Sequence, residues 1–219
     1  MIKSDIQPEQ PGYTFGKNQI EKKMKTQFIA VMALMTLALG ACKKDKDVAP
    51  EPKRTVKTAT LTLKNYDTEK DPSKAIVWFS VSDRSAHTMG EITADADLQK
   101  NISFGYNLNE IDWGLYSPGT YPHEYGQENW KNKNTTIFKK MSVSFDVFAK
   151  QAQSDPGSIN EVFIIQQFQD GSGAEASVKN FPEGAVYVFE TADGIKGIVR
   201  VSGMAKNLQT VDLKVWVLQ

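Results

Sequence analysis

This 219-residue chain predicts an α+β fold made mainly of antiparallel β-sheet, in a sandwich-like arrangement. Three observations support that fold class. Strand-type patterns open the domain, two short helix-type patterns follow them, and the last part of the chain has the pattern of a three-stranded meander. Strands and helices segregated in this way indicate an antiparallel sheet with the helices on one side or at one end.

Three segments at the start of the domain have the composition of β-strands. Residues 56–64 (VKTATLTLK) alternate apolar side chains with threonine and lysine, and residues 75–82 (AIVWFSVS) are dense in β-branched and aromatic side chains. Residues 101–106 (NISFGY) alternate again and predict a third short strand. The following IDWGLY, residues 111–116, is either the continuation of that strand or its partner.

Two helices are predicted in the middle of the chain. In SFDVFAKQAQ, residues 144–153, apolar side chains recur at i, i+3, i+4 and i+7, Ser144 can cap the N-terminus, and the Asp-Pro-Gly that follows ends the pattern. Residues 158–161 (SINE) then have the form of a capping box before VFIIQQF. This box favours a second helix over the strand that the β-branched residues would also allow.

The C-terminal part has the clearest strand pattern. AVYVFET (185–191) and KGIVRVSG (196–203) flank a turn with Asp193 and Gly194 at its tip, which predicts a β-hairpin. VDLKVWVL (211–218) alternates as well and predicts the third antiparallel strand of a meander.

The N-terminal part has the layout of a bacterial lipoprotein precursor. Lysines precede an unbroken apolar run at residues 28–39, which has the length of a signal peptide and is too short to span a bilayer core of about 30 Å as a helix. Leu39, Gly40, Ala41 and Cys42 then resemble a lipobox, in which small residues precede the cysteine that receives the lipid. The alternative is a short buried core helix that ends in an incidental cysteine; Cys42 is the only cysteine in the chain.

These features divide the chain into four parts. Residues 1–23 are predicted to be an upstream extension before the true start, 24–41 the signal peptide, 42–55 a lipid-anchored flexible tether, and 56–219 a single β-rich domain. The tether is charged and contains prolines, and it could hold the domain up to roughly 40 Å from a membrane. Lysine follows the cysteine, in place of the aspartate that retains lipoproteins in the inner membrane. We therefore expect the outer membrane or the cell surface, through the lipid anchor.

The charge balance argues against some partners. The whole chain has 26 basic and 26 acidic residues, and without residues 1–41, which hold five lysines and three acids, 21 basic and 23 acidic residues remain. No basic excess exists to hold nucleic acid or to add to membrane binding. We therefore expect no nucleic-acid partner.

Several stretches carry a family resemblance. GAVYVFETADGIKGIVRV, NISFGY with IDWGLYSPG, and NTTIFKKMSVSFDVFAK resemble uncharacterised surface lipoproteins of Bacteroidota, and the lipoprotein layout with the final meander is loosely similar to their HmuY-like haem-binding relatives. The looser resemblance covers about a third of the domain, and no haem-ligand motif matches position by position. It implies a lipid-anchored, non-enzymatic protein and no particular ligand residues.

The two histidines are the candidate haem ligands. His87 and His123 lie in polar, turn-rich stretches, and two neutral imidazoles can hold haem iron from both axial sides. Met89 is an alternative ligand. The competing interpretation is two solvent-exposed loop histidines with no cofactor at all.

An aromatic loop is the candidate binding site. Five large rings occur within eighteen residues, together with prolines and glycines that keep the segment irregular. Such rings either stack on a sugar or porphyrin, or fold back and form a small core for the loop. The five candidate contact residues are Trp113, Tyr116, Tyr121, Tyr125 and Trp130.

Carboxylates in the same region could in principle form a glycosidase pair, but solvation at the protein surface is the better explanation for them. They are Glu110, Asp112, Glu124 and Glu128. No nucleophile, phosphate-loop or dinucleotide motif is present, so we assign no catalytic and no metal-binding residue. The sequence predicts a non-enzymatic domain that binds a small molecule, a glycan or a protein, with a haem carrier as the alternative and a glycan-processing protein as the next.

Overall fold

The computed structural model describes residues 54–122 and 126–219, and the chain from Lys53 to Gln219 forms one compact unit. Several predictions of the sequence lie outside the described residues. They are the division into extension, signal peptide and most of the tether, the lipobox Leu39-Gly40-Ala41-Cys42, and the candidates His123 and Tyr125.

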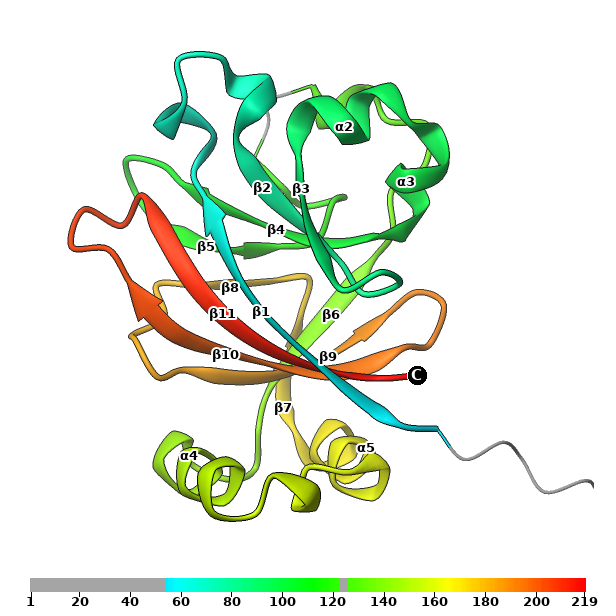
Figure 1. Ribbon diagram of the computed structural model, residues 1–219, viewed down its shortest axis with the longest axis vertical. Helices are drawn as coiled ribbons and strands as arrows, with labels where there is room; N and C mark the ends of the chain where they lie inside the picture. Colours follow the sequence, from blue (N-terminus) through cyan, green and yellow to red (C-terminus); the bar gives the residue numbers. More distant parts are fainter. Residues whose placement is uncertain (1–53, 123–125) are drawn as a thin grey trace, which may run out of the picture. The chain divides into compact units, whose positions relative to one another are not determined.

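Two antiparallel sheets form the centre of this unit, which confirms the predicted α+β fold with sandwich-like antiparallel sheet (Figure 1). The six-stranded sheet has the order β1-β11-β10-β9-β6-β7, and the five-stranded sheet has the order β3-β2-β4-β5-β8. The strands are β1 (Val56–Lys64), β2 (Ile76–Ser80), β3 (Ser85–Thr88), β4 (Ile102–Leu108), β5 (Trp113–Tyr116), β6 (Thr136–Lys140), β7 (Ser172–Glu175), β8 (Ser177–Lys179), β9 (Val186–Thr191), β10 (Lys196–Met204) and β11 (Thr210–Leu218).

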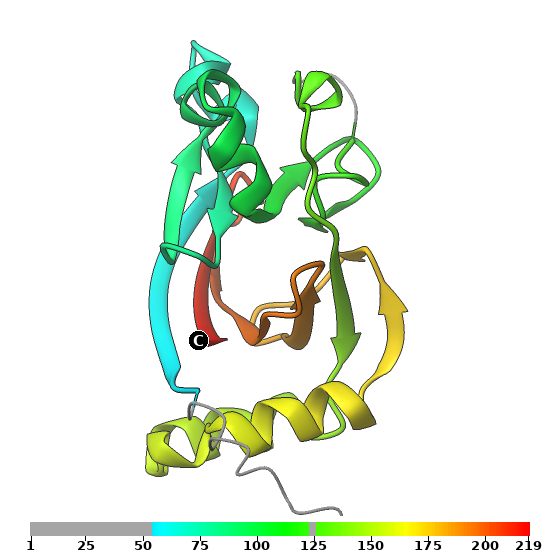
Figure 2. The same ribbon diagram turned by 90° about the vertical axis from the view of Figure 1, so that its right-hand side faces the viewer.

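Helices lie at both ends of the stack of sheets. Figures 1 and 2 show α4 and α5 beneath the six-stranded sheet, while α2 and α3 lie at the opposite end beside the five-stranded sheet. The α-helices are α2 (Met89–Ala94), α3 (Ala96–Asn101), α4 (Phe145–Ser154) and α5 (Glu161–Asp170), and the single-turn helices are η1 (Tyr66–Thr68), η2 (Pro72–Lys74), η3 (Gln127–Asn129) and η4 (Pro156–Ser158).

Strand alternation separates the apolar side chains into three cores. On β9, Tyr187 and Phe189 point between the two sheets, whereas Val186 and Val188 point to the α4–α5 layer. This is the period of two expected of a strand whose faces are both buried. The third core, which we call the aromatic cluster, lies on the outer face of the five-stranded sheet and includes Trp78.

The meander and both predicted helices are confirmed. Strands β9, β10 and β11 pair in sequence, and Gly194 at the hairpin tip has φ +82°, a conformation that glycine adopts without steric cost. Ser144 caps α4 through the backbone N–H of Val147. The predicted capping box of the second helix is wrong: Asn160, two residues after Ser158, accepts the cap hydrogen bond from Phe163.

Other features were left open by the sequence or differ from its interpretation. Strand β1 pairs with the C-terminal β11 across its whole length and not with the strand that follows it. The stretch around His87 is strand β3, not a loop. Helices α2 and α3 were not predicted, because each is only six residues long and shows less than two turns of periodicity. A capping box of Thr88 and Glu91 at α2 is the local signal that was overlooked.

Candidate functional site

The predicted aromatic contact residues are mostly buried. Tyr116, Tyr121 and Trp130 are 2%, 3% and 5% exposed, so the idea that these rings offer a free stacking surface is wrong for them. Trp113 is half-buried in β5, and its indole N–H donates to the carbonyl of Phe181 at 3.1 Å. The rings therefore act as a core for the loop that carries them, the alternative that the sequence left open.

Trp78 is the reason for this burial. Its ring lies against Gly105 of β4, where an added Cβ would come within 2.5 Å of it, so the indole covers the outer face of the sheet. Tyr121 and Trp130 pack on Trp78 with ring centroids 4.4 and 4.9 Å away. Because an apolar sheet face must be covered, the loop rings are drawn inward.

The aromatic cluster also contains unsatisfied polar atoms. The indole N–H groups of Trp78 and Trp130, both amide atoms of Asn107 and the Oε1 of Gln127 are buried without a hydrogen-bond partner among the residues that the structure describes. An unpaired buried polar group costs about 1–3 kcal/mol, so such groups are uncommon in native proteins. The two indoles belong to the aromatic cluster and Asn107 lies on β4, so most of these atoms belong to the end of the domain that holds the five-stranded sheet.

Beside the aromatic cluster lies a hollow of about 600 Å³, which we call the apolar hollow. Met89 belongs to both, because it packs into the cluster and also lines the hollow. The other walls come from η1, η2, α2 and the loop before η3, and most of the surface they offer is apolar. The lining residues are Tyr66, Pro72, Ser73, Met89, Gly90, Thr93, Ala94 and Gly126.

A second hollow of about 740 Å³, the polar hollow, adjoins the first at Tyr66, which lines both. It is built by three chain turns, after β1, between β4 and β5, and before β11. Its residues are Asn65, Tyr66, Asp67, Leu108, Asn109, Glu110, Ile111 and Gln209.

The polar hollow is held by hydrogen bonds of its own. The amide of Asn65 donates to Asp67 at 2.8 Å and exchanges bonds of 3.1 Å with both backbone groups of Leu108, which ties the first two turns together. The Oε1 of Gln209 is buried and has no partner within the described part of the chain. A ligand hydroxyl or ammonium group could donate to it.

Nearby titratable groups have structural roles. Burial acts to raise the pKa of Asp112, but hydrogen bonds from Tyr116 and Lys179 outweigh it and leave that pKa below its ordinary value. The Tyr116 hydroxyl and the Lys179 ammonium lie 2.7 and 2.9 Å from the carboxylate. Burial raises the pKa of Tyr106, whose hydroxyl donates to the carbonyl of Leu208 at 2.6 Å. Asp112 is thus a bonded structural carboxylate, while Glu110 lines the polar hollow.

The haem hypothesis receives no support from His87. Its Nε2 lies 2.9 Å from the Oδ2 of Asp83, and the residue lines neither the apolar nor the polar hollow. Over residues 54–122 and 126–219, no group of three or more His, Cys, Asp or Glu side chains is arranged to hold a metal ion.

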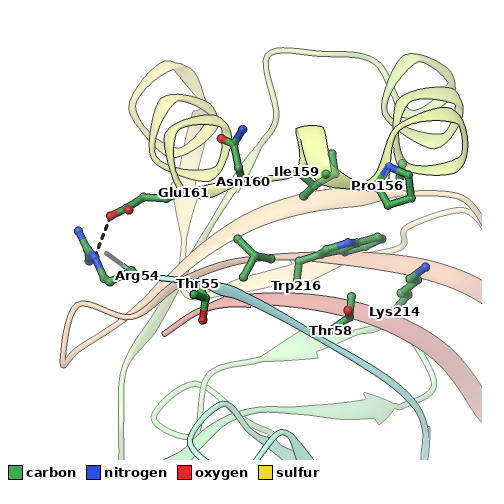
Figure 3. A pocket seen from close by; sticks show the side chains of 12 residues that line it. Arg54, Thr55, Thr58, Pro156, Ile159, Asn160, Glu161, Lys214 and Trp216 are labelled. Atoms are coloured by element: carbon green, nitrogen blue, oxygen red, sulfur yellow. Dashed lines mark hydrogen bonds and ion pairs between the residues drawn. The ribbon is translucent and has the colours of Figure 1, made fainter. Parts of the chain in front are cut away.

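A third hollow, of about 400 Å³, lies between β1, β11 and the helical layer (Figure 3). The Arg54 side chain meets Glu161 of α5 at its edge at 3.0 Å. The ring of Trp216 lies in the hollow, but Lys214 sits 5.1 Å from its centroid and the Phe148 ring packs at 5.2 Å. With those neighbours the ring is only 5% exposed, so it offers little surface for stacking.

Sequence reasoning missed most residues of the two adjoining hollows. The exceptions are Met89, which it considered only as a haem ligand, and Glu110, which it considered only as a possible glycosidase carboxylate. Tyr66, Gly126 and Gln209 are far apart in the sequence and have no motif in common. No protein-family model, curated protein or solved structure matches the chain. In the described ranges, no helix is long and apolar enough to cross a membrane.

Proposed function

We propose that this chain is a lipid-anchored protein of the outer membrane or cell surface whose domain binds an amphipathic small molecule without transforming it. The lipobox-like residues 39–42 support the anchoring. The adjoining apolar and polar hollows, which meet at Tyr66, are the observation that supports the binding.

The sizes and walls of the hollows support one class of ligand. Small-molecule sites commonly measure about 300–1,000 Å³ and combine apolar walls with a few polar groups that orient the ligand. The apolar hollow would take a hydrocarbon or ring portion, and the polar hollow would take the hydrophilic end. Asp67 and Glu110 make the second hollow acidic, so an uncharged hydroxylated or a cationic end fits it and an anionic end is repelled.

A series of amphiphiles tests this proposal. Octyl glucoside, octylamine and octanoate carry alkyl chains of similar length and differ mainly in the charge of the polar end. Isothermal titration below their micellar concentrations should give measurable binding of the first two and the weakest binding for octanoate. Equal affinity for all three, or none for any, would contradict the assignment of the two hollows.

Two alanines provide a matched pair of variants. Ala94 lines the apolar hollow at the end of α2, whereas Ala96 at the start of α3 does not line it, and both are exposed. Ala94→Phe should fill the hollow and weaken binding by about tenfold or more, while Ala96→Phe should leave it unchanged. If both variants bind as the wild type does, the ligand lies elsewhere.

Haem is a second candidate for the apolar hollow. Tyr66 and Met89 line it, and tyrosine oxygen and methionine sulfur are both used as haem ligands. Titration with haemin, followed by the Soret absorbance, should then give a saturable shift that Met89→Leu alters and His87→Ala does not. An unshifted spectrum would remove haem from consideration.

A further inference from the structure

A fourth hollow, of about 670 Å³, lies at a different place in the fold, between the end of α3, the segment that leads into β6, and the β9–β10 turn. We call it the basic hollow. The dipeptide Lys-Asn occurs three times in its lining, once from α3 and twice in succession from the segment before β6. Its residues are Lys100, Asn101, Lys131, Asn132, Lys133, Asn134, Ala192 and Asp193.

The segment 131–134 is held in place by hydrogen bonds to α3 and to the β9–β10 turn. The backbone N–H of Lys131 donates to Oε1 of Gln99 at 3.1 Å, and the Gln99 side chain is itself buried. The Asn134 side chain accepts from the backbone N–H of Ala192 at 3.1 Å. Burial alternates along the segment, with Lys131 and Lys133 exposed and the two asparagines partly buried. Both lysine side chains are therefore on the exposed side of this segment.

These positive charges are only partly balanced. Lys100 is paired with Asp97 at 2.7 Å, and the Asp193 carboxylate is hydrogen-bonded to Thr191. Lys133 donates at 2.9 Å to the backbone carbonyl of Glu128, which carries no net charge. Lys131 has no side-chain partner within the described ranges. Asp193 keeps its negative charge, because a threonine hydroxyl is neutral. Lys131 and Lys133 have no carboxylate partner in the described ranges, so they leave the lining with a net positive charge that attracts an external anion.

We propose that the basic hollow binds an acidic polysaccharide, with Lys131 and Lys133 contacting its carboxylate or sulfate groups. Asn101, which is exposed beside them, offers an amide that can donate to and accept from sugar hydroxyls. No aromatic side chain lines the hollow on which the base of a single-stranded nucleic acid could stack. Asparagine amides and ammonium groups are sufficient to hydrogen-bond the hydroxyls and acidic groups of a charged saccharide, so the lining favours a saccharide.

Fluorescence polarisation with fluorescein-labelled polygalacturonate tests the proposal on the mature chain from Cys42, with Cys42→Ser to keep it in solution. The double variant Lys131→Gln/Lys133→Gln should weaken binding by about fivefold to tenfold, the size expected for two exposed ion pairs. The matched control Lys57→Gln/Lys70→Gln removes two exposed lysines outside the hollow and should change nothing. Raising the salt concentration should weaken the wild type more than the double variant.

Two competitors separate the proposed ligand class from others. Unlabelled pullulan, a neutral glucan, should not displace the probe, and a single-stranded oligonucleotide of equal charge should displace it less well than polygalacturonate does. Equal displacement by the oligonucleotide would mean a general polyanion site and would overturn the saccharide assignment. Unchanged affinity of the Lys131→Gln/Lys133→Gln variant, or an equal loss in the control, would overturn the site itself.

Discussion

Replacement of Trp130 tests whether the aromatic side chains of residues 113–130 contact a ligand or form a core for their own loop. The ring is 5% exposed, packs 4.9 Å from Trp78, and its N–H has no hydrogen-bond partner within the described residues, so its contribution is burial alone. Replacing a buried tryptophan by alanine costs about 3–5 kcal/mol. For a domain of this size 1 kcal/mol lowers Tm by about 2–4 °C, so Trp130→Ala should lower it by roughly 6–20 °C.

Differential scanning calorimetry measures this directly, with two comparisons. Trp130→Phe keeps most of the buried ring and loses no hydrogen bond, so its cost should be clearly smaller than that of the alanine variant. The exposed neighbour in Lys131→Ala should change stability by no more than about 0.5 kcal/mol. A Trp130→Ala protein that melts within about 2 °C of wild type and loses octyl glucoside binding would refute the assignment of this ring to the core.

Three further predictions concern the anchor, the domain boundary and pH. Cys42→Ala should abolish labelling of the protein by a fatty-acid analogue in cells, and label that persists would exclude this cysteine as the lipidated residue. A chain that begins at Lys53 should have the same Tm as a chain that begins at Cys42. Further removal of Arg54 and Thr55 should lower Tm, because the backbone N–H and C=O of Thr55 both hydrogen-bond the backbone of Gln219. The free energy of unfolding should fall as pH rises above about 10, because Tyr106 then loses its proton in the unfolded chain while its raised pKa keeps it protonated in the folded one. Unfolding followed by circular dichroism in alkali should show a smaller loss of stability in Tyr106→Phe.

The local pattern of apolar and polar residues was sufficient to predict many of the helices and strands. The alternation in residues 56–64 and 185–218 and the helical spacing after Ser144 reappear as β1, the meander and α4, because each depends on side chains that are close in the chain. The partner of β1 was not predictable in this way. Its pairing with β11 joins residues about 150 positions apart, and it depends on which sheet edge is free after the rest has folded.

The candidate site also combines features that were visible in the sequence with features that depend on distant parts of the chain. The aromatic density of residues 113–130 was visible in the sequence, but whether a ring faces water or a core depends on what lies opposite it. Here the opposite surface is Trp78, on a strand distant in sequence, and the small residue beneath it, Gly105. The hollows that meet at Tyr66 likewise gather side chains from separate turns.

The sequence by itself determined the α+β class, the C-terminal meander and the two helices that follow residue 143, because periodicity and capping depend on neighbouring residues. It also predicts export and lipid attachment at Cys42 from a short motif. Only the tertiary structure decided that Tyr116, Tyr121 and Trp130 are core and that hollows open beside them. Burial is a property of two surfaces in contact, and the second surface comes from a distant part of the chain.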